Sequence, residues 1–89
     1  MNAIITVVGT DKVGIIARVS AFLAERNINI EDISQTILSG NFVMMMMVDL
    51  SRSSKSLEAV KGELVIMGES MGVSVTMIHE GVFSAMHRI

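Results

Sequence analysis

Apolar residues in this chain alternate between the two-residue period of strands and the longer period of helices. β-Branched side chains dominate residues 3–8, which predicts a buried strand, and turn residues follow from Gly9 to Lys12. Apolar residues then return at the i, i+4, i+7 and i+8 spacing of a helix that packs on a sheet. They are Ile15, Val19, Phe22 and Leu23. Asn27 is suited to end this helix, because Asn tolerates the left-handed conformation of a helix C-terminus.

The middle of the chain has the pattern of a β-hairpin. Residues 28–38 return to a β pattern, and residues 42–50 form a second apolar run. The link between them, residues 39–41, is short and contains Gly40. We therefore expect the second run to fold back as the antiparallel partner of the first.

The last third of the chain predicts three further elements. An amphipathic helix is expected over residues 57–71 and ends at Gly72, a strand follows over residues 73–79, and residues 81–89 form a short helix. The resulting order is β-α-β-β-α-β with a terminal helix. It predicts one domain over residues 1–89, of the α+β class, with a ferredoxin-like antiparallel sheet, helices on one face and a short C-terminal helix.

The composition of the chain predicts that it forms an oligomer. Hydrophobic residues make up 51% of the 89 residues and charged residues 18%, which excludes a disordered segment. The chain has nine Met and no Cys, so it offers no disulfide, zinc-thiolate site or thiol nucleophile, and we expect it in the reducing cytoplasm. A domain of this size buries only about 65% of its unfolded-chain surface. The apolar excess therefore predicts burial between subunits.

Charge and hydropathy argue against nucleic acid and membrane as partners. The formal net charge is −2, and the seven basic residues are spread along the chain without the clustered footprint of a nucleic-acid binder. The longest apolar run covers residues 42–48, far short of the roughly 18 residues of a membrane span. The N-terminal residues lack the pattern of a signal peptide.

Alternation also gives the Met-rich third strand two apolar sides. One side is expected to carry Phe42, Met44, Met46, Val48 and Leu50, and the other Val43, Met45 and Met47. With helices on only one face of the sheet, the second side needs its own cover. The terminal helix with Val82, Phe83 and Met86, a second copy of the chain, or both are candidates. We predict a homodimer that pairs through sheet edges or through this second face.

The most informative motif is the turn between the first strand and the first helix. Residues 9–19 read GTDKVGIIARV, and residues 27–32 read NINIED. In this spacing the chain resembles the ACT domain, over its whole length. It also resembles a family of stand-alone ACT-domain proteins of bacteria and archaea, in residues 32–36 (DISQT) and 83–86 (FSAM).

The chemistry of the turn favours binding of a carboxylate. Gly14 allows close approach of backbone, and the first N–H groups of a helix have no partner within the helix. They carry partial positive charge and can hold an α-carboxylate, while Asp11 can receive an α-ammonium. Two plainer interpretations stay open. Asp11 can serve only as an N-cap, at about 1 kcal/mol, and Gly14 can serve only helix packing.

The resemblance implies a site between two subunits, with this turn on one subunit and the start of the second strand on the other. By that correspondence Asp11 and Gly14 belong to the turn, and Asn29 reaches across from the partner. The predicted ligand-binding residues are Asp11, Lys12, Val13, Gly14, Ile15, Asn29 and Ile30. Asp32 is better explained by local backbone bonding.

Metal and cofactor sites are not expected. His79 and His87 are eight positions apart, with Glu80 as the nearby carboxylate. The Met run at residues 44–47 sends only two side chains to each face, which favours packing over Cu(I) binding.

Two functions remain after these exclusions. The first is a regulatory protein that binds an amino acid or similar small carboxylate at a homodimer interface and signals to a regulated protein. The alternative is a ligand-free dimerising module that regulates an enzyme or transcription factor by docking. Catalysis is not expected, since the chain lacks Cys and a Walker-type phosphate loop.

Overall fold

The computed structural model describes residues 1–10 and 12–86 and has the predicted order of elements. The strands are β1 (Asn2–Gly9), β2 (Asn29–Leu38), β3 (Asn41–Asp49) and β4 (Ser74–His79). The helices are α1 (Lys12–Glu25), α2 (Leu57–Met71) and α3 (Glu80–Met86). The strands form one antiparallel sheet in the order β2-β3-β1-β4. This confirms the ferredoxin-like fold.

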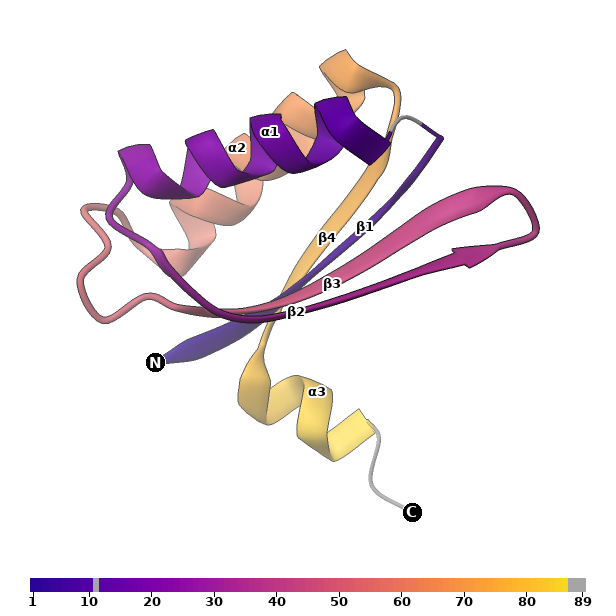
Figure 1. Ribbon diagram of the computed structural model, residues 1–89. Coiled ribbons are helices and arrows are strands. Elements are labelled where there is room, and N and C mark those ends of the chain that lie inside the picture. Colours follow the sequence, from indigo (N-terminus) through magenta and orange to yellow (C-terminus); the bar gives the residue numbers. More distant parts are fainter. Residues whose placement is uncertain (11, 87–89) are drawn as a thin grey trace.

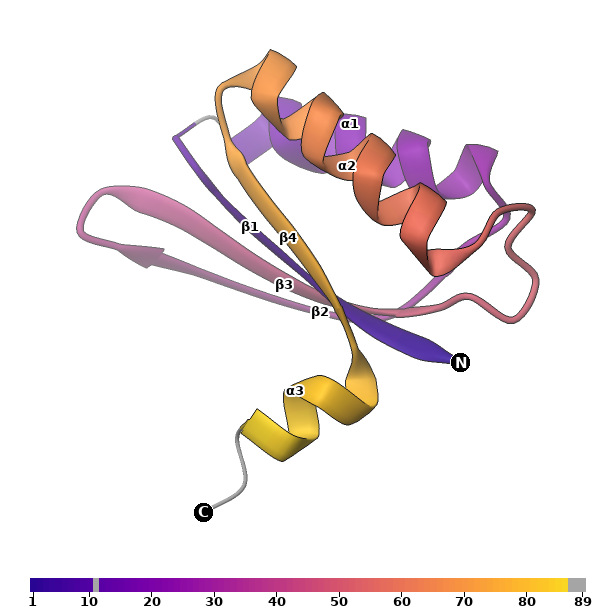
Figure 2. The ribbon, with the colours of Figure 1, turned by 180° about the vertical axis from the view of Figure 1, so that it is seen from behind.

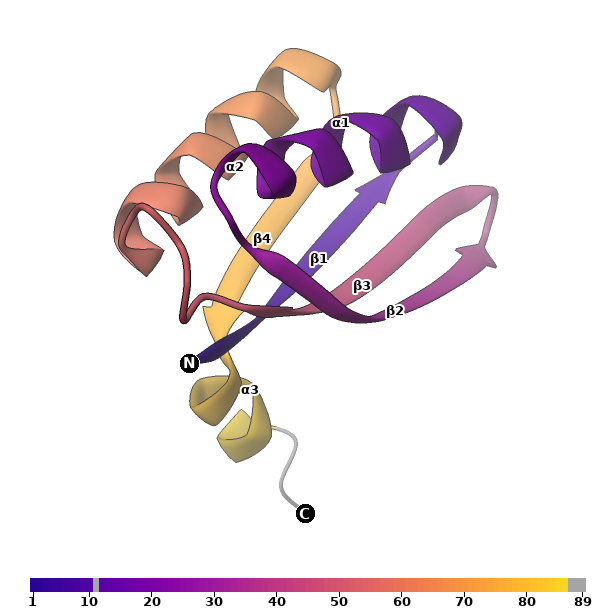
Figure 3. The same ribbon diagram turned by 60° about the vertical axis from the view of Figure 1, so that its left-hand side comes forward.

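The helices lie in two places around the sheet. Helices α1 and α2 lie side by side on one face, as Figures 1 and 2 show from opposite sides. Helix α3 follows β4 and lies beyond the other face of the sheet, near the end where β1 begins (Figure 3). The tip of the β2–β3 hairpin extends away from α3 at the opposite end.

The helices begin and end at residues that are typical of helix caps. Ser56 caps α2 by accepting a hydrogen bond from the Ala59 N–H at 3.2 Å. Gly72 ends the same helix with φ of 73° in the left-handed region, which suits glycine. Asn27 has φ of 60° and ends α1 as predicted. The N-cap predicted at Asp11 lies outside the described residues.

Two irregularities shape the β2–β3 hairpin. Its turn has positive φ at both central positions, 53° at Ser39 and 79° at Gly40, and this conformation matches the twist of adjoining strands. A bulge between Ile30 and Asp32 places Glu31 outside the regular pairing with β3. Ile30 therefore faces the helices, whereas Asp32 points to the opposite face of the sheet.

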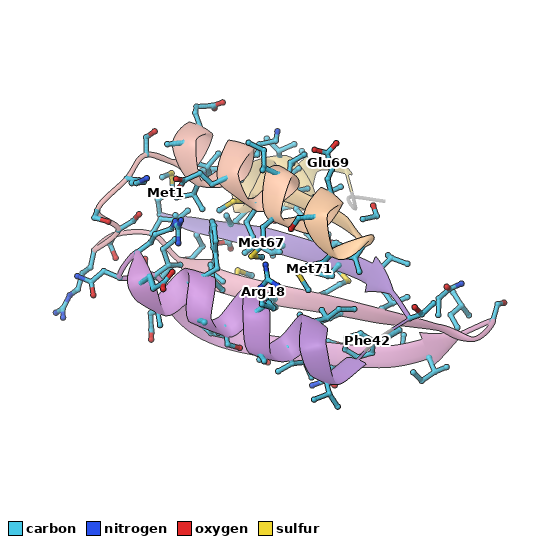
Figure 4. All side chains as sticks on the ribbon, turned by 90° about the horizontal axis from the view of Figure 1, so that it is seen from above. Met1, Arg18, Phe42, Met67, Glu69 and Met71 are labelled. Atoms are coloured by element: carbon cyan, nitrogen blue, oxygen red, sulfur yellow. The ribbon has the colours of Figure 1, made fainter. Side chains whose placement is uncertain are left out.

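The core lies between the helices and one face of the sheet. Alternate residues of β3 and the residue that follows it are buried there as predicted, namely Phe42, Met44, Met46, Val48 and Leu50. They meet alternate residues of β1 and β4, namely Ala3, Ile5, Val7, Val75 and Met77. The helices cover this layer with Ile15, Val19, Phe22, Leu23, Val60 and Leu64. Figure 4 looks down on it between α1 and α2.

The second face of the sheet, which we call the open face, is only partly covered. Val43, Met45 and Met47 of β3 point to it and are half-buried. Phe83 of α3 and Ile4 of β1 line a cavity of about 170 Å³ on this face, together with Met45 and Met47. Helix α3 therefore covers part of the second apolar side, as the sequence led us to expect.

Candidate functional site

The predicted carboxylate turn opens into a small cavity between the helices. It has a volume of about 230 Å³ and is lined by Thr10, Gly14, Ile15, Arg18, Met71, Gly72 and Val73. We call it the turn cavity. From above, Arg18 and Met71 appear between α1 and α2 (Figure 4). Gly14 and Ile15 thus line one cavity beside the start of α1, while Asp11 lies outside the described residues.

Two of the three apolar residues of the predicted set, Ile15 and Ile30, pack into the core. The Ile15 side chain is buried in the core, and Ile30 packs against the core from β2. Because their side chains pack in the core, they can contribute to a ligand site only through their backbone groups or by shaping its wall. Val13 differs, because 78% of it is exposed at the start of α1.

Asn29 lies far from the turn within one chain. It begins β2, just after the C-terminal end of α1, whereas Gly14 is in the first turn of that helix. A helix of 14 residues is about 20 Å long. One protomer therefore holds Gly14 and Asn29 apart, and they can share a ligand only across a subunit boundary.

Asn29 lines a larger cavity of its own, which we call the Asn29 cavity. Its volume is about 550 Å³, within the usual range for small-molecule sites. Its walls are Ala24, Asn27, Ile28, Asn29, Asp49 and Arg52. Sequence reasoning missed Asp49 and Arg52. The available signal was a carboxylate and a guanidinium close together after the Met-rich strand.

Asp49 is held in place by the residues that follow it. Its Oδ1 accepts hydrogen bonds from the Ser51 hydroxyl at 2.6 Å and the Ser51 N–H at 3.0 Å. These bonds, the hydroxyl first, lower the pKa of the Asp49 carboxyl below its ordinary value. The N-terminal ammonium of Met1 also lies 3.8 Å from Oδ1. The cavity therefore carries an ionised carboxylate at neutral pH.

A charged cluster joins the helices beside this cavity. The Arg26 Nε donates to Glu63 Oε1 at 3.0 Å, and Lys55 Nζ donates to Glu63 Oε2 at 2.7 Å. Arg26 also lies over the Phe22 ring, with its Cζ 3.6 Å from the ring centroid. The hydrogen bond from Lys55, and then that from Arg26, lowers the pKa of Glu63 below its ordinary value of 4.5. The cluster links α1 to α2 and to the loop after β3.

Because of this cluster, we expect Glu63 to contribute to a loss of fold stability in acid. A carboxyl whose pKa is lower in the folded state stabilises the fold above its ordinary pKa, here 4.5, and loses that contribution as pH falls through the folded value. Glu63→Gln should therefore show a smaller fall in melting temperature between neutral pH and pH below 4.5 than the unchanged protein. Circular dichroism melts across this range measure it.

Glu69→Gln is the matched control for that experiment. Glu69 lies on the same helix, and its carboxylate forms no hydrogen bond or ion pair with the described residues. Its substitution should leave the acid dependence of the melting temperature unchanged. Equal acid dependence in Glu63→Gln and the unchanged protein would contradict a role for the cluster.

Residues 1–10 and 12–86 contain no group of three or more His, Cys, Asp or Glu placed to hold a metal ion. Within the same residues, no helix is long and apolar enough to cross a membrane.

Comparison with known proteins assigns the chain to a family. The family model of the ACT domain matches residues 2–78. The chain belongs to the ACT-domain family. A UPF0237 protein of Clostridium acetobutylicum is 55% identical over 89 residues, with 100% of both chains covered. Another UPF0237 protein, of Methanopyrus kandleri, is 51% identical over 88 residues, covering 99% of this chain and 98% of the relative.

A solved structure supports the same assignment. An ACT domain protein from Streptococcus pneumoniae superposes with a TM-score of 0.82 at 41% identity, covering 93% of each chain. The family model thus covers residues 2–78, and this ACT domain protein covers 93% of the chain. This confirms the family resemblance of the turn motif and the second-strand motif.

Proposed function

We propose that this ACT-domain protein is a cytoplasmic regulator that binds an α-amino acid, or a similar small carboxylate, between the two subunits of a homodimer. Occupancy of the site then changes the dimer geometry and signals to a regulated protein. The observation that carries this proposal is the separation of Gly14 and Asn29 at opposite ends of α1. A site that uses both needs a second copy of the chain.

The edge of β2 supports pairing between copies. β2 has β3 as its neighbour on one side, and its other edge is open. Its exposed apolar residues are Ile33, Ile37 and Leu38, which are 41%, 64% and 66% exposed. The strand has no Lys, Arg or Pro, the residues that commonly prevent edge pairing. The opposite edge strand, β4, exposes polar Ser74 and Thr76 instead.

Side-chain direction selects one register for such pairing. Ile33, Gln35 and Ile37 pair with buried residues of β3 and so point to the helix side of the sheet. Two antiparallel copies of β2 centred on Gln35 would set Ile33 opposite the partner's Ile37, and the same pair occurs twice by symmetry. Moving the centre by one residue would instead set Ile37 opposite the partner's Glu31 or Gln35.

The same register places the turn before α1 of one protomer and Asn29 of the other at one end of the dimer interface. Centring on Gln35 sets Asp32 opposite the partner's Leu38, the last residue of β2, so Asn29 lies beyond the turn of the partner's hairpin. Within each chain Gly9 pairs with Phe42, so the turn before α1 lies at that same end of the sheet. Asn29 of one protomer and the turn of its partner would thus converge. The first N–H groups of α1 would then bind the ligand's carboxylate beside Asn29 of the partner.

A thermal-shift screen against the twenty amino acids tests the proposed function. At least one amino acid should raise the melting temperature, because a ligand that binds only the folded state stabilises it. Asp11→Ala and Asn29→Ala should each reduce that rise, whereas Asp32→Ala, which removes a nearby carboxylate that bonds the Ile33 N–H, should not. A dimer that responds to no amino acid would contradict ligand binding and favour the ligand-free docking module.

A further inference from the structure

The Asn29 cavity presents opposite charges on one concave surface. Asp49 is at the end of β3 and Arg52 is in the loop that follows, and both line the cavity. The amides of Asn27 and Asn29 also line the cavity, and Ala24 and Ile28 add an apolar part. A surface with a carboxylate, a guanidinium, amides and an aliphatic floor is complementary to a small zwitterion.

The charged groups of the cavity keep bonding capacity for a ligand. Arg52 forms no hydrogen bond or ion pair with the residues that the structure describes. Every described hydrogen bond of the Asp49 carboxylate uses Oδ1, which leaves Oδ2 for an additional donor. Asp49 and Arg52 do not form an ion pair with each other. Their charges are therefore not neutralised by mutual pairing.

Local hydrogen bonds position the loop that carries Arg52. The Ser53 N–H donates to the Leu50 carbonyl at 3.0 Å, and the Ser54 N–H donates to the Arg26 carbonyl at 3.1 Å. Asn29 is the cross-strand partner of Asp49 in the β2–β3 pairing. The carboxylate and the amide thus come from paired strands, and the guanidinium comes from a loop anchored to the end of α1.

We infer that the Asn29 cavity binds the charged groups of an α-amino acid, with Arg52 on the carboxylate, Asp49 on the ammonium, and Ala24 and Ile28 beside the aliphatic part. This inference rests on the proposed function for the ligand class and adds the residues that recognise the ligand's charges. It is compatible with the partner's turn, because a carboxylate offers about four lone-pair sites, enough for a guanidinium and helix N–H groups together.

Nuclear magnetic resonance titration of the ¹⁵N-labelled full chain tests this inference. Each of the twenty amino acids is added separately, and acetate and methylammonium serve as probes that carry only one of the two charges. An amino acid should shift the backbone signals of Asn29, Asp49 and Arg52, and it should bind more tightly than either single-charge probe. Acetate binding as tightly as the best amino acid would overturn the recognition of a zwitterion.

Variants that each remove one charge locate the site. Arg52→Met should weaken amino-acid binding at least about tenfold, since it removes a charge-assisted hydrogen bond. Asp49→Asn should weaken it as well. Lys61→Met removes a cation from the exposed surface of α2, outside both cavities, and should leave the affinity unchanged.

The outcomes separate this inference from the proposed function. If amino acids bind, and Arg52→Met and Asp49→Asn bind them as well as the unchanged protein, the Asn29 cavity does not recognise the charges and the proposed function still stands. If none of the twenty amino acids shifts any signal of the dimer, the proposed function fails and this inference fails with it.

Discussion

Replacing Ile37 with glutamate is expected to separate the proposed dimer into monomers. Full burial of an isoleucine side chain contributes roughly 1.5–3 kcal/mol, and a symmetric dimer contains two copies of Ile37. Ile37→Glu removes both contributions and sets a carboxylate opposite the partner's Ile33, where its charge is poorly solvated. The dissociation constant should rise at least about 100-fold. Sedimentation equilibrium over a dilution series would then give the monomer mass of 9.6 kDa.

Ile66→Glu is the control for this change. Ile66 is 67% exposed on α2, about as exposed as Ile37, but it lies on a helix and not on the sheet edge. The same substitution there should leave the dimer intact. A stable 9.6 kDa monomer for the unchanged protein at micromolar concentration would contradict the homodimer itself.

Single cysteines test the register, because the chain has no cysteine of its own. With β2 strands centred on Gln35, Gln35→Cys should form a disulfide between two identical chains under mild oxidation. Ser34→Cys or Thr36→Cys alone should not, but a mixture of those two variants should cross-link. Strong self-linking at Ser34 or Thr36 would move the centre of pairing. Efficient cross-linking of Met45→Cys would instead favour a dimer through the open face.

Truncation of Leu64 is expected to cause a large loss of fold stability. Leu64 of α2 is fully buried in the core, with 0% of its surface exposed. Leu64→Ala leaves a cavity that its neighbours only partly fill, at a cost of about 2–5 kcal/mol. The melting temperature should fall by at least about 10 °C for a domain of this size. Thermal denaturation at one fixed protein concentration measures it, because dimerisation makes the melting temperature depend on concentration.

Ile66→Ala provides the matched comparison on the same helix. Ile66 lies two positions further along α2 with most of its side chain in solvent, so its truncation should change stability by less than about 1 kcal/mol. Similar losses for the two variants would contradict the assignment of the core to one face of α2.

The fold could be predicted from the sequence because local signals agreed with the tertiary structure. Alternation in β3 separates the buried Met44 and Met46 from the half-buried Met45 and Met47. Gly72 ends α2 because a left-handed residue is needed there. These effects act over one or two turns or along one strand, so a linear pattern contains them.

The candidate site could be predicted only in part. The turn was recognisable because its residues are contiguous, and Gly14 does line a cavity there. Asp49 and Arg52 were missed because the length of the β2–β3 hairpin separates them from Asn29 in the sequence. The β2–β3 pairing brings Asp49 beside Asn29, and the loop to α2 brings Arg52 to the same cavity. No pattern within a short stretch of sequence indicates that these residues line one cavity.

For this protein, sequence alone determined the order of elements, the ACT-domain family motif and the two apolar sides of the third strand. Those properties depend on periodicity and on contiguous residues. Only the tertiary structure decided that β2 is an edge strand with exposed apolar residues and that Asn29 shares a cavity with Asp49 and Arg52. Strand order and side-chain direction decide these relations, because both depend on how distant segments pair.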